Sequence, residues 1–482
     1  MPKCVIASVL VGIALVLGGV VLLVGKYPEK IIDSEINKQL AISLNSPEFD
    51  DWMTPPPPIY MQYWMFNVTN PDAVIAGQRA NLTQIGPFTY RLYQPRYNVA
   101  LYTNNTVSYQ YNHTLVFVKN MSCADPHNVT ITNLNVPLLT IAGMLKNMHI
   151  PAFISKKIIE IFKDSKVFPQ HTAYELLFGY NDSLLSFAHM FIPSFPAKFG
   201  LFYGFNNTDD GVYLVNSGRK DISLVNKMEK WNFKSELDYW SDKYGNMLNG
   251  TDGVFFHPDM KITETIYAYS TDICRSLPFK YEMNTDVRSI STYRYHTTAM
   301  AFANSTVNPN NGAFCVPAGN CMGSGVLNIS VCKDNAPVVI SSPHFYLGDP
   351  KYVNGVIGLK PNKTYHETYL DIEPTTGTVL RANKRLQLNI QLEASEYSDD
   401  LKNVRTTTFP FVWLNESVTV DVDSANHLKQ VLMVKQVVLS TPYILFGISA
   451  LIFVIIIIVT IHKNKKKGTP LLTNVDYDED EN

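Results

Sequence analysis

Long apolar segments lie near both ends of this chain, whose other positions mix polar and apolar residues. The first covers residues 5–25, and the second covers residues 437–461 and carries no charge. A helix rises about 1.5 Å per residue, so about 20 apolar residues cross a hydrocarbon core of about 30 Å. We therefore expect two transmembrane helices and, between them, one large domain at residues 26–436.

The flanking charges predict how the chain crosses the membrane. Lysines at positions 463, 465, 466 and 467 follow the second segment, and basic loops stay in the cytosol, which places the tail at 462–482 there. The first segment follows Lys3 and could instead be a cleaved signal peptide. Its apolar core is longer than the usual roughly 7–15 residues, and positions 25–27 offer no small-residue cleavage site. We favour an uncleaved anchor, with residues 1–4 also cytosolic.

Between the two segments, apolar and polar residues alternate in several short runs. Residues 107–112, 386–392 and 418–422 show this period of two, which is typical of strands buried on one side. Such strands suit an antiparallel sheet or barrel. The predicted fold class is therefore α+β and mainly β.

One part of the large domain, about residues 136–191, has a helical pattern instead. Apolar residues recur at helical spacing at Ile154, Ile158 and Ile161, and lysines lie mostly on the other faces. Pro151 fits the first turn of such a helix, which we place at about 152–165. The pattern predicts a helical insertion in a β protein.

Acceptor sequences for N-glycosylation are spread evenly over the large domain, and none lies outside it. This distribution indicates that the domain faces the secretory lumen. The thirteen candidate sites are Asn67, Asn81, Asn104, Asn112, Asn120, Asn128, Asn181, Asn206, Asn249, Asn304, Asn328, Asn362 and Asn415.

The cysteines agree with a lumenal domain. The lumen is oxidising, so a late group of four favours two disulfides with three possible pairings over a zinc site, which would have no histidine within that run. Cys4 is a candidate for palmitoylation or simply a small apolar residue, and Cys123 is expected to be a buried free thiol. The late group is Cys274, Cys315, Cys321 and Cys332.

No catalytic, metal-binding or nucleic-acid-binding pattern stands out. The run at 323–325 lacks the spacing of a nucleophile elbow, and His366-Glu367 lacks the second histidine of a zinc motif. The acidic run at 476–480 lacks the glycine of a calcium loop. We interpret these residues as solvated surface, and a formal net charge of −2 gives no reason to expect nucleic acid. The sequence therefore predicts no enzyme, metal or cofactor.

Several longer strings resemble the class B scavenger receptors, over both apolar segments and nearly the whole domain between them. The resemblance implies an irregular antiparallel β-barrel topped by an apical helical bundle, with an apolar tunnel that carries lipids such as cholesterol or phospholipid. The strings are residues 59–71, 85–91, 249–253 (NGTDG), 272–276 (DICRS), 343–345 (PHF) and 369–374 (YLDIEP).

Within this family, residues 314–328 (FCVPAGNCMGSGVLN) most resemble a lysosomal member. That resemblance implies disulfides Cys315–Cys321 and Cys274–Cys332. It also implies that the apical helices bind a lysosomal hydrolase of the β-glucocerebrosidase type and release it in acid. The ligand-binding candidates are His149, Lys156, Lys157 and Lys163.

Two features depart from that lysosomal pattern. This chain has two additional residues near His149 and a proline at position 151, and a surface histidine without a role is the other interpretation of His149. In the tail, Leu471 and Leu472 form a candidate signal for adaptor proteins, but Lys467 stands where the family has an acidic residue.

The sequence thus predicts a two-pass lysosomal membrane protein, with some endosomal or plasma-membrane presence, that sorts a hydrolase and conducts lipid. A plasma-membrane scavenger receptor for lipoproteins and lipids is the alternative. A structural glycoprotein that shields the lysosomal membrane is a third class.

Overall fold

The chain folds into two units in the computed structural model, which describes residues 3–44, 46, 48–147, 160–161, 165–191 and 196–467. The described residues of Met1–Lys38 and Asn426–Asn482 form a terminal unit. Residues Gln39–Ala425 form the second unit, which we call the sheet unit.

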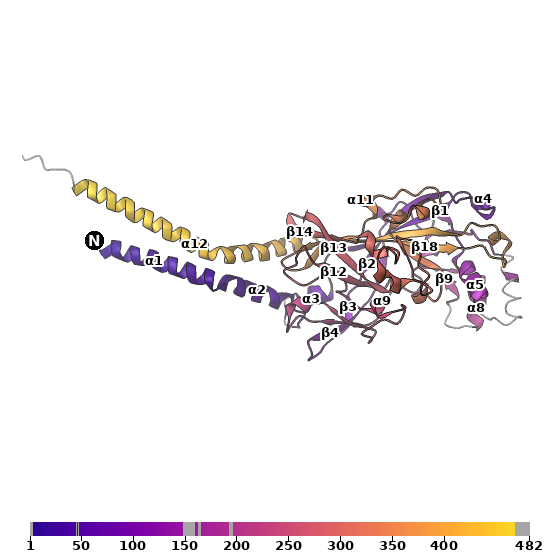
Figure 1. Ribbon diagram of the computed structural model, residues 1–482, viewed down its shortest axis with the longest axis horizontal. Helices are drawn as coiled ribbons and strands as arrows, with labels where there is room; N and C mark the ends of the chain where they lie inside the picture. Colours follow the sequence, from indigo (N-terminus) through magenta and orange to yellow (C-terminus); the bar gives the residue numbers. More distant parts are fainter. Residues whose placement is uncertain are drawn as a thin grey trace, which may run out of the picture. The chain divides into compact units, whose positions relative to one another are not determined.

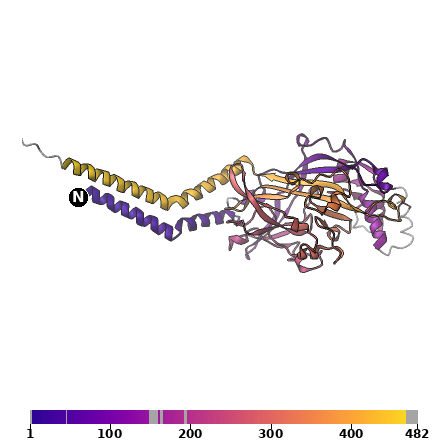
Figure 2. The ribbon, with the colours of Figure 1, turned by 45° about the horizontal axis from the view of Figure 1, so that its top comes forward.

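Two long helices make up most of the terminal unit. Helix α1 spans Lys3–Val24 and α12 spans Val422–Lys467, and they run beside each other (Figures 1 and 2). The Ser449 hydroxyl donates a hydrogen bond of 2.9 Å to the Gly12 carbonyl. A Cβ atom built on Gly12 would lie 2.8 Å from the ring of Phe453. Glycine therefore lets the aromatic ring approach the α1 backbone, as small residues do between membrane helices.

Both helices are long and apolar enough to cross a membrane: Lys3–Val24 and the Val422–Lys463 part of α12. This agrees with the prediction of two membrane helices near the ends of the chain, whereas the bounds of the two spans stay a prediction. The predicted strand at residues 418–422 is wrong beyond Thr419, because Asp421 caps a helix there and its carboxylate accepts the Ser424 N–H at 2.9 Å. The helix continues without interruption into the apolar segment.

A large antiparallel sheet forms the body of the sheet unit. Among the described residues it has 11 strands, and its main path runs β12-β13-β14-β17-β18-β19-β1-β2-β5, with β16 on β18 and β15 on β16. The strands are β1 (Ile59–Val68), β2 (Leu82–Tyr93), β5 (Thr114–Phe117), β12 (Thr265–Ser270), β13 (Arg275–Val287), β14 (Ile290–His296), β15 (Val326–Asn328), β16 (Val338–Ser341), β17 (Tyr369–Glu373), β18 (Thr378–Leu392) and β19 (Thr407–Thr419).

The path of this sheet is open in the part of the chain that the structure describes, since no pairing joins β12 to β5. The expected barrel is therefore found only as a large antiparallel sheet. The prediction of strands buried on one side is also wrong for β18, whose Gln387 and Asn389 are fully buried. Asn389 satisfies its amide by donating to the Val339 carbonyl of β16 at 3.0 Å, so hydrogen bonding permits polar residues on the covered face.

A smaller sheet with its own core lies in the same unit. Its order is β11-β10-β4-β3, and Val107, Tyr109, Tyr213 and Val215 are buried around it together with Trp52. Its strands are β3 (Arg96–Leu101), β4 (Thr106–Tyr111), β10 (Tyr213–Asn216) and β11 (Met228–Trp231), and two short pairs are β6 (Thr130–Thr132) with β7 (Gln170–Thr172) and β8 (Tyr180–Asn181) with β9 (Lys198–Phe199).

Helices lie in the predicted insertion, although residues 148–159 and 162–164 fall outside the described residues. There α5 contacts α8. A capping box in which the Glu175 carboxylate accepts the Thr172 N–H at 2.8 Å begins α7. The other α-helices among the described residues are α2 (Tyr27–Leu40), α3 (Phe49–Met53), α4 (Pro71–Ile75), α5 (Val136–Asn147), α7 (Ala173–Phe178), α8 (Ser183–Phe191), α9 (Lys243–Asn246), α10 (Pro350–Val353) and α11 (Lys363–His366).

Candidate functional site

A pocket of about 690 Å³ opens between α5 and the chain segments at the ends of β15, β16 and β18, and we call it the α5 pocket. Asn135 begins α5 by accepting the Leu138 N–H at 3.0 Å. The lining residues are Leu139, Thr140, Ala142, Gly143, Asn328, Ser330, Asn335, Pro337, Val339, Gln391, Glu393, Ala394, Ser395, Glu396 and Tyr397.

The walls of this pocket have a mixed character. Leu139 and Ala142 of α5 and Val339 of β16 supply apolar surface, whereas Glu393 and Glu396 supply carboxylates. A volume of roughly 300–1,000 Å³ is typical of pockets that bind small molecules. The arrangement suits an amphipathic molecule whose apolar part contacts α5.

Two phenol groups inside the large sheet have no hydrogen-bond partner among the described residues. The hydroxyls of Tyr63 on β1 and Tyr90 on β2 are buried, and their ring centroids lie 5.9 Å apart. Burial raises the pKa of both phenols, so they remain uncharged donors. An unpaired buried hydroxyl is costly, and these donors suit a polar group of an interior ligand.

Disulfides join Cys274 to Cys332 and Cys315 to Cys321. These are the pairs that the family resemblance implies, among the three that the sequence itself leaves open. Cys123 is exposed rather than buried, so that expectation is wrong. It lies on an irregular segment after β5, where its sequence neighbours are also polar or small.

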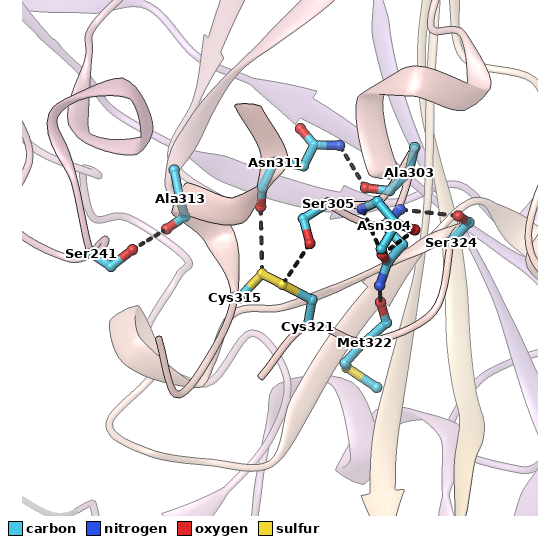
Figure 3. The surroundings of a disulfide bond; sticks show 11 residues. Ser241, Ala303, Asn304, Ser305, Asn311, Ala313, Cys315, Cys321, Met322 and Ser324 are labelled. Atoms are coloured by element: carbon cyan, nitrogen blue, oxygen red, sulfur yellow. Dashed lines mark hydrogen bonds between the residues drawn. A yellow bond between two sulfur atoms is a disulfide. The ribbon is translucent and has the colours of Figure 1, made fainter. Parts of the chain in front are cut away.

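Polar contacts surround the disulfide between Cys315 and Cys321 (Figure 3). Asn304 donates from its side-chain amide to the Met322 carbonyl at 2.7 Å, and its backbone N–H donates to the Ser324 hydroxyl at 3.0 Å. The Ser305 hydroxyl lies 3.1 Å from the sulfur of Cys321. The loop between Cys315 and Cys321 is therefore tied to the segment that carries the sequon at Asn304.

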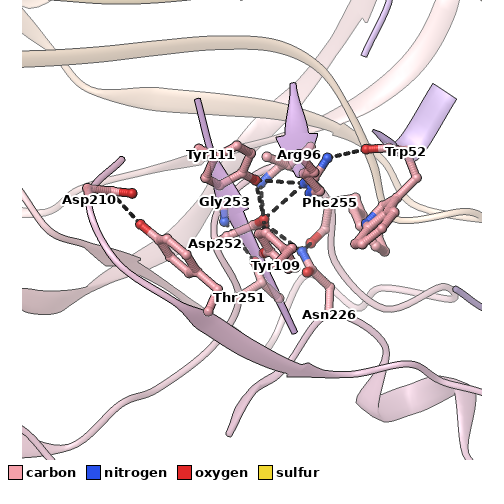
Figure 4. Close-up of polar contacts among 12 residues, drawn as sticks. Trp52, Arg96, Tyr109, Tyr111, Asp210, Asn226, Thr251, Asp252, Gly253 and Phe255 are labelled. Carbon is pink, nitrogen blue, oxygen red and sulfur yellow. Dashed lines mark hydrogen bonds and ion pairs between the residues drawn. The ribbon is translucent and has the colours of Figure 1, made fainter. Parts of the chain in front are cut away.

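A buried ion pair joins the small sheet to the NGTDG string (Figure 4). Arg96 on β3 lies 3.1 Å from Asp252, and their side chains are 0% and 2% exposed. The hydroxyls of Tyr109 and Tyr111 each donate to the same Asp252 oxygen at 2.7 Å, and Asn226 donates to the other oxygen at 2.6 Å.

The charges in this cluster are balanced. Burial alone would raise the pKa of Asp252, but Arg96 and the hydrogen-bond donors outweigh it, and the pKa lies below its usual range. Gly250 in the same string has φ +76°, and a Cβ there would lie 1.8 Å from the Tyr267 carbonyl oxygen. The string is therefore explained by a close backbone approach and a buried ion pair, which point to a structural role.

A pair of stacked histidines explains the PHF string. The rings of His344 and His366 lie 4.4 Å apart, and the Nδ1 atom of His344 accepts the Lys360 N–H at 3.0 Å. Burial lowers the pKa of His344 to about 4, and burial followed by the charges of neighbouring groups lowers that of His366 to about 3. Both rings remain neutral in mild acid.

The interpretation of His366 and Glu367 as solvated surface is wrong, because both are 5% exposed. Among the described residues, Glu367 forms a group with Glu282 and His296 that has the donor atoms of a metal site. Sequence reasoning missed this group because its members are separated by up to 85 positions and come together only through strand pairing.

The predicted hydrolase and sorting residues lie outside the described residues. They are His149, Lys156, Lys157, Lys163, Leu471 and Leu472.

The predicted glycosylation sites are all described. Those with exposed asparagines are Asn81, Asn104, Asn120, Asn128, Asn181, Asn206 and Asn362, and those with partly exposed ones are Asn67, Asn112, Asn249, Asn304 and Asn328. Asn415 is buried in β19, where its amide donates to Gln62 at 3.2 Å.

Comparison with known proteins places this arrangement in a family. The sequence matches the CD36 family over residues 10–460. It is 37% identical over 446 residues to Lysosome membrane protein 2 of Rattus norvegicus and 36% identical to that of Homo sapiens, covering 92% of this chain and of each relative. It is 30% identical over 463 residues to Scavenger receptor class B member 1 of Bos taurus, covering 95% of this chain and 89% of the relative. The chain belongs to the CD36 family.

Proposed function

We propose that this CD36-family protein is a receptor of the lysosomal membrane that binds a lysosomal hydrolase and sorts it to that compartment. The observation that carries the proposal is the 37% identity with Lysosome membrane protein 2 over 92% of the chain. Two terminal helices of membrane-spanning length support a two-pass protein. The lysines that follow the second apolar segment support a cytosolic position for both termini. We expect glycans first at the seven exposed sequons and none at the buried Asn415.

The hydrolase, of the β-glucocerebrosidase type, binds the basic segment after α5. Its candidate contacts are His149, Lys156, Lys157 and Lys163. The test uses the full-length chain in detergent, immobilised at pH 7 and offered purified β-glucocerebrosidase, and then washed at pH 5. Capture at pH 7 and release at pH 5 support the receptor role. A chain that captures no hydrolase at pH 7 contradicts it, and a Lys156→Ala/Lys157→Ala variant checks that the basic segment is the contact.

We also propose that the sheet unit carries an amphipathic lipid, such as cholesterol or phospholipid. The α5 pocket and the unpaired hydroxyls of Tyr63 and Tyr90 support this part of the proposal. Gly143 lines the pocket, and a Cβ there meets no atom within 4 Å, so Gly143→Trp brings an indole to the pocket wall. Photoreactive cholesterol should label the parent and the matched Gly143→Ala control, and label Gly143→Trp less. Equal labelling of all three removes the pocket from the lipid path.

The second candidate is a plasma-membrane scavenger receptor for lipoproteins and lipids. The 30% identity with Scavenger receptor class B member 1 favours it, as does Lys467 in the tail. Surface biotinylation and lipoprotein binding on cells that express the chain separate the two candidates. A chain found mainly at the cell surface that binds lipoprotein and no hydrolase supports the second.

A further inference from the structure

Three side chains with metal-ligand atoms meet in the large sheet, away from the α5 pocket. The ligand atoms of Glu282, His296 and Glu367 all lie within 4.8 Å of one another. His296 Nδ1 is 3.0 Å from Glu367 Oε1. The Glu282, His296 and Glu367 side chains are 16%, 21% and 5% exposed, so this is not a solvated surface cluster.

Strand pairing places these residues together. Glu282 is the extra residue of a bulge in β13, because Tyr281 pairs with Tyr295 of β14 and Met283 pairs with Arg294. A bulge redirects a side chain and is common next to functional sites. His296, the last residue of β14, pairs with Tyr369 at the start of β17. Glu367 lies two positions before Tyr369 and follows α11 directly.

The two oxygens of Glu282 differ in their surroundings. Lys363 on α11 donates to Oε1, whereas Oε2 is buried and has no hydrogen-bond partner among the described residues. The Lys363 side chain is 56% exposed and can move into solvent. A buried carboxylate oxygen without a partner is unfavourable. A cation held by Glu282 together with His296 and Glu367 would remove that cost.

The neighbouring basic and phenolic groups do not occupy this position. Arg294 directs two N–H groups to Asp371 at 2.7 and 2.8 Å. Arg385 donates to the backbone carbonyls of Thr364 and Glu367. Burial and the charge of Glu367 raise the pKa of Tyr346, so its phenol stays neutral. Among the described residues, Lys363 is the basic side chain that contacts one of the three proposed ligands, the carboxylate of Glu282.

We propose that Glu282, His296 and Glu367 form a binding site for a divalent transition-metal ion, with Zn²⁺ as the best match. One nitrogen and two carboxylate oxygens, with a water as the fourth ligand, are a donor set that zinc accepts in tetrahedral geometry. Tetrahedral ligands about 2.0–2.2 Å from zinc lie about 3.3–3.6 Å apart. The three donors, which lie within 4.8 Å of one another, would therefore have to approach by about 1 Å. Ca²⁺ and Mg²⁺ prefer oxygen ligands and larger coordination numbers.

Zinc binding to the full-length chain in detergent tests the proposal. The chain is treated with a chelator, equilibrated with micromolar ZnCl₂ at pH 7.5, and its bound metal is counted by mass spectrometry. The parent should bind one zinc ion more than Glu367→Gln. The zinc affinity of this variant should fall at least about tenfold, because mutating even a residue that only hydrogen-bonds a metal ligand lowers affinity about 10–100-fold. Lys363→Met should tighten binding, because zinc no longer has to displace the ammonium from Glu282.

A matched control is the pair His257 and Glu264, which lie 3.1 Å apart with side chains 30% and 27% exposed. No third ligand joins this pair among the described residues, so Glu264→Gln should leave zinc binding unchanged. Thermal unfolding in the presence of chelator verifies that each variant is folded. If Glu367→Gln is not folded, Glu282→Gln takes its place in the experiment. A parent that binds no more zinc than Glu367→Gln or Glu282→Gln overturns the proposal and leaves an ion-pair network.

Discussion

The guanidinium of Arg96 lies 3.1 Å from the carboxylate of Asp252, and neither side chain reaches solvent appreciably. These residues are 156 positions apart and connect β3 to the loop that precedes β12. Asp252→Asn would leave a buried guanidinium without its counter-charge. Removing one partner of a buried pair costs about 3–5 kcal/mol, so we expect a loss of that size in the free energy of unfolding, measured by denaturant titration.

The matched control is Asp209→Asn. Asp209 is exposed and accepts a hydrogen bond of 2.8 Å from Tyr97, which follows Arg96 on β3. It should cost about 1 kcal/mol or less. The folded pKa of Asp252 lies below its unfolded value of about 3.9. Its contribution is therefore present above pH 4 and is lost as the pH falls through the folded pKa. Equal losses in both variants would contradict the role of the buried pair.

His344 should make the chain less stable in mild acid. Its folded pKa of about 4 lies below the unfolded value of about 6.5, so the unfolded chain takes up the proton first. Stability should decline from pH 6.5 toward pH 4, by about 2 kcal/mol at pH 5. His344→Gln should remove this part of the decline, measured as the pH dependence of the unfolding free energy, and His257→Gln should not. A similar part should remain, because the pKa of His366 is lowered to about 3. A parent whose stability is constant over this range would show that His344 is accessible to protons.

The sequence predicted strands where the alternation of residues is local, and it failed where a property depends on distant pairing. Residues 386–392 do form part of β18, but Gln387 is buried. Its amide donates to Asn389 and its side-chain oxygen accepts the His344 N–H, so its burial is matched by hydrogen bonds. The alternation at 418–422 also runs past the end of β19, since a period of two cannot show that Asp421 caps a helix. Local rules identify elements, whereas burial of polar groups follows from their partners.

The candidate sites show the same limit. The disulfide partners came from a family resemblance, because four cysteines permit three pairings. The side chains of His366 and Glu367 were predicted to be solvated, although both are buried. Helix α11 is only four residues long, so its sequence has no periodic pattern that would show which side is buried. Closure of the sheet likewise depends on whether β12 meets β5, which no single strand's sequence encodes.

The two disulfides should contribute unequally to stability. Cys274 and Cys332 are separated by 58 residues, whereas Cys315 and Cys321 are separated by 6. In the chain-entropy model, replacing the first pair by serine costs about 4 kcal/mol and replacing the second costs about 2. Denaturant unfolding measures the difference, with the exposed Cys123→Ser as the control without effect. Peptide mapping without reductant that finds these four thiols free would exclude both bonds.

The tail should direct the protein through Leu471 and Leu472. Leu471→Ala/Leu472→Ala should increase the fraction of the chain at the cell surface, because an adaptor loses both apolar contacts. Surface biotinylation measures this fraction, and Val475→Ala, another apolar residue of the tail, is the control. A double variant that remains in lysosomes would place the signal elsewhere.

Hydrolase binding should weaken as the pH falls from 7 to 5. Protonation of His149 adds positive charge near Lys146, Lys156 and Lys157, and a bound partner that encloses this segment makes the repulsion stronger. The pKa of His149 is then lower in the complex, so protonation opposes binding. A difference of one unit corresponds to about 1.4 kcal/mol, or about tenfold in affinity.

The measurement is the dissociation constant for β-glucocerebrosidase at several pH values, for the full-length parent and for His149→Ala. The variant should lose most of the pH dependence and retain binding at pH 7, because alanine removes the titrating group without adding charge. His189→Ala is the control, since this histidine lies on α8 in the same insertion. If the parent and His149→Ala share one pH profile, another group controls release, and if His189→Ala flattens the profile instead, that group lies on α8.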